Sequence, residues 1–245
     1  MAQPVPVTDV KVLSRLYTGR RQVRRPAVSE LRPIHALDTE TYNGDIFLIA
    51  DSDGRYLDKD ITADSMLEFL FAKKYQNSWN FFYNLGYDAE SILKLLGSGG
   101  LGVYARTRRT SFAHGKYRLR YIPGKCLQIM KGHHSAVFYD IAQYYNRVPL
   151  TRAYQENVGA LEKAYLAFKT LRSQFSPRFY RDHTSQVRGY CIDDCRYTKA
   201  IAQKWVSLFH DAFGFYPARW FSQGYLAEKV LINNGVNFPT FDSIP

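Results

Sequence analysis

The sequence predicts an α/β fold in which helices flank a mixed β-sheet. Of its 245 residues, 46% are apolar, which is ample for a buried core. Short apolar runs bounded by turn residues come first along the chain, and longer helical patterns follow them. We expect a basic amino-terminal arm over residues 1–30 and one large domain over residues 31–245.

The strands are expected mainly in the first part of the chain. They cover residues 34–39, 45–50, about 55–58, 78–83 and 136–139. Asn43-Gly44 predicts a tight turn between the first two strands, because both residues tolerate a positive φ. A basic hairpin insertion is expected over about 104–131, with strands at 116–122 and 125–130 that turn at Pro123-Gly124.

Helical patterns are expected at residues 64–74, 88–96, about 150–170, 185–212 and about 218–233. Gly97–Gly102 spells the glycine fingerprint of dinucleotide sites, but that motif must follow a strand and open a helix. Here the glycines follow a helical run, so we interpret them as a helix stop and a connector.

Four acids and a tyrosine are the candidate catalytic residues. Asp38 and Glu40 end an apolar run that predicts a buried strand, and strand alternation places them on one face. Tyr190 and Asp194 are four apart within a helical pattern and are therefore neighbours on one helix face. Asp88 follows an aromatic run that predicts a strand.

Clustered carboxylates repel one another, and divalent cations usually offset that repulsion. Oxygen ligands suit Mg²⁺ or Mn²⁺, and two such ions can activate water and stabilise a leaving oxygen. Each motif alone has a simpler explanation: a loop for Asp38 and Glu40, a helix N-cap for Asp88, and a surface pair for Tyr190 and Asp194. Their joint order favours a two-metal site.

These motifs resemble the 3′-to-5′ exonuclease domain of family B DNA polymerases, within the superfamily named for four acids and a tyrosine. Within this family, the chain most resembles the branch of protein-primed viral and plasmid DNA polymerases. The three motifs are Asp38-Thr-Glu40, Asn84-Leu-Gly-Tyr-Asp88 and Tyr190 through Asp194. The resemblance covers roughly residues 31–232. It implies a ribonuclease-H-like mixed β-sheet flanked by helices.

The resemblance also implies roles for individual residues. The four acids would hold two Mg²⁺ or Mn²⁺ ions, and Tyr190 would orient the attacking water. Asn84 would contact the 3′-terminal nucleotide, with Tyr87 and Phe82 as further candidates. Asp140 and Ile141 lie where the family contacts single-stranded DNA, although the residues that follow depart from the family pattern. Lys169 fits the spacing of a phosphate-supporting lysine, with Lys163 as a rival.

The resemblance leaves several functions open. The polymerase motifs are missing and the chain stops at Pro245, so we expect either a free-standing nuclease or a split amino-terminal part of a polymerase. Two further hypotheses are a replication accessory module with a vestigial nuclease site and an RNA 3′-end exoribonuclease. Matched DNA and RNA substrates would separate the exoribonuclease from the DNA exonuclease.

The charge balance favours a polyanionic partner. The net charge is +11, from 33 basic and 22 acidic residues, and phosphate neutralisation releases counterions. One basic cluster is Gly19–Pro26. A second runs from Arg106 through Arg120, contains Arg108, Arg109, Lys116 and Arg118, and has no acidic residue. Solvated surface is the simpler explanation for each cluster. We expect DNA 3′ ends as the partner, and a DNA polymerase or another replication protein as a second partner.

Neither a signal peptide nor an apolar run of membrane-spanning length is visible. We therefore expect an intracellular, cytoplasmic protein without a membrane partner, and the resembled branch makes a viral or plasmid origin one option. The three cysteines do not form a disulfide framework. Cys191 and Cys195 are four apart on a helix, and we interpret them as small core residues rather than zinc ligands.

Overall fold

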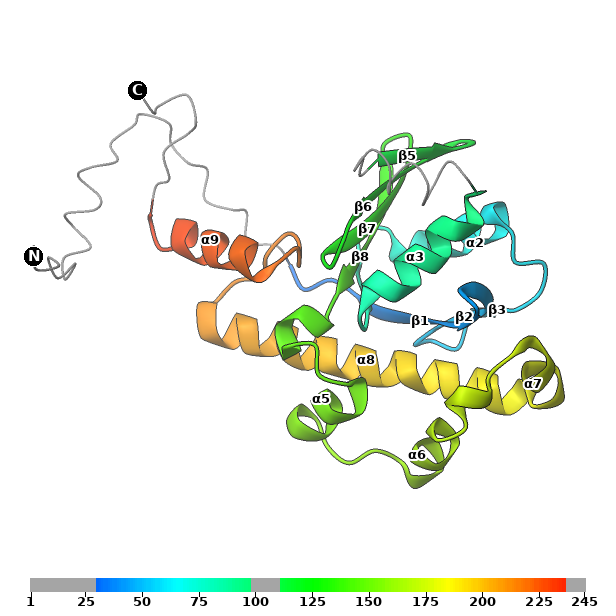
Figure 1. Ribbon diagram of the computed structural model, residues 1–245. Helices are drawn as coiled ribbons and strands as arrows, with labels where there is room; N and C mark the ends of the chain where they lie inside the picture. Colours follow the sequence, from blue (N-terminus) through cyan, green and yellow to red (C-terminus); the bar gives the residue numbers. More distant parts are fainter. Residues whose placement is uncertain (1–29, 98–110, 237–245) are drawn as a thin grey trace, which may run out of the picture. The chain divides into compact units, whose positions relative to one another are not determined.

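The computed structural model describes residues 30–97 and 111–236 of the chain (Figure 1). Contacts divide the chain into two units. The larger unit is Leu31–Gly214, and the other combines Met1–Glu30 with Phe215–Pro245. The basic cluster Gly19–Pro26 lies outside the described residues. The sheet and the predicted acids all belong to the larger unit.

Eight strands of the described residues form one mixed sheet, which confirms the predicted mixed α/β class. Their order across the sheet is β3-β2-β1-β4-β8-β7-β6-β5. The strands are β1 (Ile34–Tyr42), β2 (Asp45–Asp51), β3 (Tyr56–Leu57), β4 (Trp79–Phe82), β5 (Ser111–His114), β6 (Tyr117–Ile122), β7 (Cys126–Lys131) and β8 (His134–Asp140).

Three central strands run in the same direction. β1 pairs with β4 and β4 pairs with β8 in parallel, whereas the other neighbouring strands are antiparallel. Leu37 on β1 lies opposite Phe82 on β4, which lies opposite Asp140 on β8. The carboxyl ends of the three parallel strands therefore meet at one edge of the sheet.

The turn between β1 and β2 has the predicted geometry. Asn43 and Gly44 have φ values of 53° and 77°, as a two-residue hairpin turn of mirror-image type requires. Gly124, in the predicted turn between β6 and β7, also has a positive φ of 65°. Turn chemistry read from the sequence therefore locates both connections correctly.

Helices cover both faces of the central strands (Figure 1). On one face, α2 (Ala63–Leu70) and α3 (Leu85–Leu95) share a buried apolar core with the strands. On the other face, α8 (Thr184–Phe213) packs across β1, β2 and β4. The core shared with α2 and α3 reaches into the hairpin strands, because Tyr117, Leu119 and Leu127 belong to it.

Three short helices pack against α8: α5 (Leu150–Asn157), α6 (Lys163–Lys169) and α7 (Pro177–Asp182). The Oγ of Ser176 caps α7 by accepting a hydrogen bond from the backbone N–H of Phe179 at 3.1 Å. α8 ends at Gly214, whose left-handed φ of 72° suits a residue without a Cβ.

The structure corrects some expected element boundaries. The expected helix at about 150–170 is interrupted between Asn157 and Lys163, where Gly159 has low helix propensity. The helix expected at 64–74 ends at Leu70, and a 3₁₀ turn, Lys73–Tyr75, follows it. β5 adds a third strand to the expected hairpin, and α7 was not predicted.

In the other unit, the structure describes Glu30 and residues 215–236. Its helix is α9 (Gln223–Asn233), capped by Ser222, whose side chain accepts a hydrogen bond from the N–H of Tyr225. Across residues 30–97 and 111–236, no helix combines the length and apolarity that a membrane crossing demands.

We predict that β6 is part of the cooperative core of the larger unit. Leu119→Ala should lower the free energy of unfolding by about 2–5 kcal/mol, because Leu119 is fully buried. Arg120→Ala, at an exposed position next to it, should change the free energy by less than about 0.5 kcal/mol. Urea denaturation followed by circular dichroism measures both. Equal effects of the two substitutions would contradict the assignment of β6 to the core.

Candidate active site

The predicted acids meet where the parallel strands end. Asp38 and Glu40 lie toward the carboxyl end of β1, on the side that α8 covers. The Sγ of Cys191 on α8 is 3.6 Å from the carbonyl oxygen of Asp38. Side-chain atoms of Asp38, Glu40 and Cys191 lie within 4.8 Å of one another. Ligands bind preferentially at this end of parallel strands.

Asp88 reaches the same region from the first turn of α3. Its Oδ1 accepts hydrogen bonds from the Thr39 backbone N–H at 3.2 Å and from the Thr39 hydroxyl at 2.6 Å. Thr39 stands between the two acids of β1. The simpler N-cap explanation of Asp88 does not apply, because α3 begins at Leu85 and its N-cap residue is Asn84.

The electrostatic interactions of these acids reflect their proximity. Burial and then the charges of Asp88 and the other acids raise the pKa of Asp38 well above its usual value. Burial and neighbouring acids also raise the pKa of Glu40 to about 8. Burial raises the pKa of Asp88 to about 7, although its hydrogen bonds from Thr39 oppose this shift. The charges of Asp88 and Asp194 act on both Asp38 and Glu40, so the four acids are electrostatic neighbours.

The site carries polar atoms that lack partners within the described part of the chain. Glu40 Oε1 and the Tyr190 hydroxyl are both buried without a hydrogen bond. A buried, unpartnered carboxylate oxygen is costly unless a cation or ligand satisfies it. The carboxylate oxygens of Asp38 and Glu40 therefore suit Mg²⁺ or Mn²⁺, and the nearby charges of Asp88 and Asp194 would add to the attraction for a cation.

Cys191 is a poor ligand for such ions. Burial and a hydrogen bond with Cys195 raise the pKa of the Cys191 thiol well above its usual value. A neutral thiol is not a metal ligand, and sulfur is a poor match for hard cations. Both cysteines are buried and unoxidised, in agreement with their interpretation as core residues.

A second tyrosine, which the sequence did not indicate, holds Asp194. The Tyr165 hydroxyl donates a 2.5 Å hydrogen bond to Asp194 Oδ1. The Tyr165 ring stacks on the Tyr190 ring, with centroids 5.3 Å apart and planes 9° apart. Because Asp194 accepts its hydrogen bond from Tyr165, the Tyr190 hydroxyl remains available, among the described residues, for another partner.

Lys169 lies beside this pair. Its Nζ donates to the Tyr165 hydroxyl at 3.0 Å and lies 4.0 Å from Asp194 Oδ1. The structure thus brings the predicted lysine to the acids. The rival Lys163 begins α6, and the structure gives it no contact with the acids.

Arg172 is the other cation near the acids, and sequence reasoning missed it. It begins a 3₁₀ turn, Arg172–Gln174, that follows α6. Burial disfavours its charged form, but the carboxylates of Glu40 and Asp38 outweigh burial and raise its pKa. Arg172 as a residue is exposed to solvent.

The ends of β4 and β8 hold a second polar network. Arg147 donates to Asp140 Oδ2 at 2.9 Å and to Asn84 Oδ1 at 3.2 Å. Asp140 is fully buried and also accepts from the backbone N–H of Asn84 at 3.1 Å. Asn84 is exposed and has a left-handed φ of 65°. Its amide nitrogen remains available to a ligand because its oxygen is held by Arg147.

The other predicted nucleic-acid contacts differ in exposure. Tyr87 is 54% exposed, and its hydroxyl lies 2.7 Å from Thr41 Oγ1. Phe82 and Ile141 are fully buried, so neither presents side-chain surface to a nucleotide in this conformation. Arg108 and Arg109 lie outside the described residues.

No family model, curated protein or solved structure matches this chain. The geometry of the site therefore carries the functional argument.

We predict that a divalent cation stabilises the protein more at high pH than at low pH. When folding raises the pKa of a carboxyl group, that group stabilises the folded state at pH values below its usual pKa. This contribution to stability is lost as the pH rises through the raised pKa. For Glu40 that window runs from 4.5 to about 8. Each pKa unit corresponds to about 1.4 kcal/mol.

Chemical denaturation at several pH values, with EDTA or with Mg²⁺, measures this effect. In EDTA, Glu40→Gln should flatten the loss of stability between about pH 5 and about pH 8. Mg²⁺ should stabilise the wild type but not this variant. Glu90→Gln, on the exposed surface of α3, is the matched control. If Mg²⁺ did not change the stability of the wild type at any pH, that result would contradict the metal assignment.

Proposed function

We propose that the larger unit is a metal-dependent 3′-to-5′ exodeoxyribonuclease with a ribonuclease-H-like fold. The observation that carries the proposal is the cluster of the partly buried Asp38 with the buried Glu40, Asp88 and Asp194, in which Glu40 Oε1 has no partner among the described residues. Burying four acids together is unfavourable unless cations bind them. The parallel core of β1, β4 and β8 with an antiparallel β2 supports the fold proposal.

When bound, a pair of Mg²⁺ or Mn²⁺ ions supplies Lewis-acid polarisation of a phosphate and lowers the pKa of water. The four acids would hold these ions. The Tyr190 hydroxyl, buried and unpartnered among the described residues, would accept a hydrogen bond from the attacking water or donate one to it. Tyr165 keeps Asp194 in place through its hydrogen bond.

Two cations of the chain would stabilise charge on the phosphate. Lys169 and Arg172 both lie beside the acids without neutralising them completely, since the pKa of Glu40 remains raised by burial despite the opposing charge of Arg172. Charge that develops on phosphate oxygens is stabilised by such fixed cations. Asn84 would contact the terminal nucleotide through its amide nitrogen.

The 3′-to-5′ direction and the preference for DNA rest on the resemblance of the three motifs. A cleft for an unpaired end would favour single strands and frayed termini, because unpairing a matched end costs energy. An exoribonuclease, a split polymerase part and an accessory module with a vestigial site are the competing functions. Digestion and binding of labelled oligonucleotides separate them.

We predict that the protein shortens 5′-labelled single-stranded DNA from its 3′ end in the presence of Mg²⁺ or Mn²⁺. Asp38→Ala with Glu40→Ala should reduce the rate by about a thousandfold or more, because both ligands leave the site. EDTA should abolish cleavage by the wild type. Gel electrophoresis of the labelled products measures the rate and the direction.

Each competing function has its own outcome. Faster digestion of RNA of matched sequence would identify an exoribonuclease. Binding of DNA without cleavage would identify an accessory module or a part that needs a missing polymerase half. Full activity of the double variant would show that the acid cluster is not the active site.

We predict different kinetic effects for the two stacked tyrosines. Tyr190→Phe should lower kcat by about 10–100-fold with little change in DNA affinity, because it removes a hydroxyl that contacts the water. Tyr165→Phe should raise the Mg²⁺ concentration for half-maximal activity by about tenfold, because Asp194 loses its hydrogen bond.

Metal titrations of cleavage rate distinguish these effects. Tyr154→Phe serves as the control, since its ring packs on Tyr197 at 4.7 Å and not on the acids. Identical metal titrations for the wild type and Tyr165→Phe would show that Tyr165 does not position Asp194.

A further inference from the structure

One face of the sheet extends beyond its helical cover. α8 packs across β1, β2 and β4, and among the described helices of the larger unit none packs extensively on the same side of β5, β6 and β7. Arg118 and Arg120 on β6 are exposed on this side, and their neighbours on β7 are Met130 and Gln128. We call these four residues the basic face.

The pairing register places the basic face on the same side of the sheet as the acids. Ala36, two residues before Asp38, pairs across β4 and β8 with Phe81 and then Tyr139. Tyr139 pairs with Cys126 on β7, and paired residues point to the same side. Because sides alternate along a strand, Gln128 and Met130 share the side of Cys126, and so do their partners Arg120 and Arg118.

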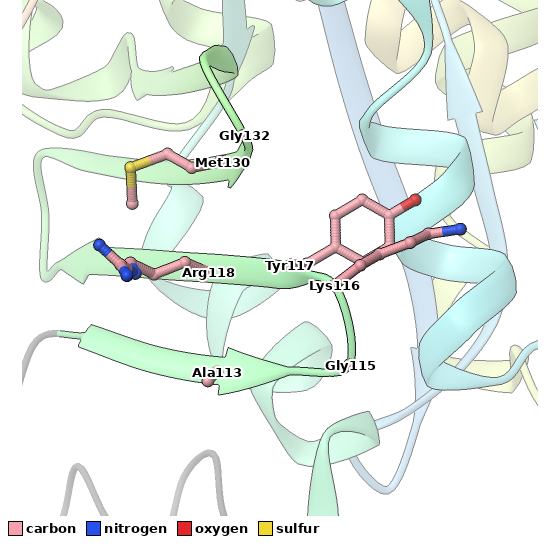
Figure 2. Close-up of a pocket in the computed structure, with 7 residues that line it drawn as sticks. All are labelled: Ala113, Gly115, Lys116, Tyr117, Arg118, Met130 and Gly132. Carbon is pink, nitrogen blue, oxygen red and sulfur yellow. The ribbon is translucent and has the colours of Figure 1, made fainter.

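The opposite side of these strands faces the core. Tyr117 and Leu119 alternate with Arg118 and Arg120 and are buried with α2 and α3. Figure 2 shows the Arg118 and Met130 side chains directed away from the Tyr117 ring. A cavity of about 330 Å³ is lined by Arg118 and Met130 together with Ala113, Gly115, Lys116, Tyr117 and Gly132.

The charge of this region is entirely positive. Residues 111–139 contain no aspartate or glutamate. Lys116 lies 3.9 Å from Glu68 of α2, but Arg118 and Arg120 have no ion-pair or hydrogen-bond partner within the described part of the chain. Two guanidinium groups without partners therefore face solvent.

The spacing of the two arginines suits a phosphate backbone. Residues two apart on a strand have Cα atoms about 7 Å apart. Phosphates of one stacked strand recur about every 3.4 Å along the helix axis, so two steps advance about 7 Å along that axis. Gln128 adds an amide for hydrogen bonding, and Met130 adds an apolar surface. A nucleic-acid strand complements this arrangement.

We propose that the basic face binds backbone phosphates of the same DNA strand whose 3′ end lies at the acids. This inference rests on the proposed function. Four strand spacings of about 4.8 Å each separate β1 from β6, which puts the two sites about 19 Å apart across the sheet. The basic face would bind nucleotides well upstream of the cleaved end. Substrate length therefore decides whether the face contributes.

The test compares the double variant, which carries both Arg118→Ala and Arg120→Ala, with the wild type. Fluorescence anisotropy in EDTA measures binding of a labelled single strand of about 20 nucleotides over a range of salt concentrations. The double variant should lower the magnitude of the slope of log K against log salt by about 1.4, since each phosphate contact contributes about 0.7. Retaining both charges with Arg118→Lys and Arg120→Lys should preserve most of the slope.

A matched control removes the same charge elsewhere. Lys59→Ala with Lys73→Ala alters two exposed lysines outside the basic face and should leave the slope nearly unchanged. Thermal melting verifies that every variant is folded. An unchanged slope in the arginine variant, or an equal loss in the lysine control, would overturn the proposal.

Cleavage kinetics provide a second readout. With the long strand, the arginine variant should raise KM about tenfold and leave kcat unchanged. With a trinucleotide, whose stacked phosphates span only about 7 Å, its kinetics should equal those of the wild type. An equal loss on both substrates would overturn the proposal. If the wild type cleaves neither substrate, the proposed function fails, while the salt slope still decides whether the basic face binds DNA.

Discussion

The burial of several carboxylates at the carboxyl end of β1 is the constraint on which the other features of the site depend. Asp38 and Glu40 cannot both be charged there without strong repulsion from Asp88 and Asp194, and their raised pKa values express this cost. The chain opposes the repulsion only in part, through Arg172 and Lys169. A fold that keeps this cluster sacrifices stability, which is typical of a functional site.

Several parts of the structure hold the acids in place. β1 presents two acids on one side, the Thr39 hydroxyl and N–H anchor Asp88, and Tyr165 anchors Asp194. Because each anchor comes from a separate element, the cluster forms only when the sheet, α3, α6 and α8 have all packed. Catalysis would benefit from this rigidity, since a preorganised site needs little rearrangement during the reaction.

The sheet also relates the acids to a surface far from them. The pairing register of the strands places Ala36 on β1 and Arg118 on β6 on the same side of the sheet. α8 covers only the part of that side near the acids. The Arg147 network at the ends of β4 and β8 lies between these regions in strand order. A single continuous side of the sheet can thus combine a reaction site with a site for the rest of a long substrate.

The sequence by itself determined the features that depend on backbone period and turn chemistry. The alternation of side chains along a strand put Asp38 and Glu40 on one side of the sheet. The four-residue spacing of Tyr190 and Asp194 put them on one face of a helix, and Asn43-Gly44 indicated the hairpin turn. Only the tertiary structure revealed Tyr165 and Arg172 beside these acids and Arg147 beside Asp140 and Asn84. It alone showed that Phe82 and Ile141 are buried. The physical reason is that local pattern depends on neighbouring residues, whereas burial and long-range contacts depend on how distant segments pack.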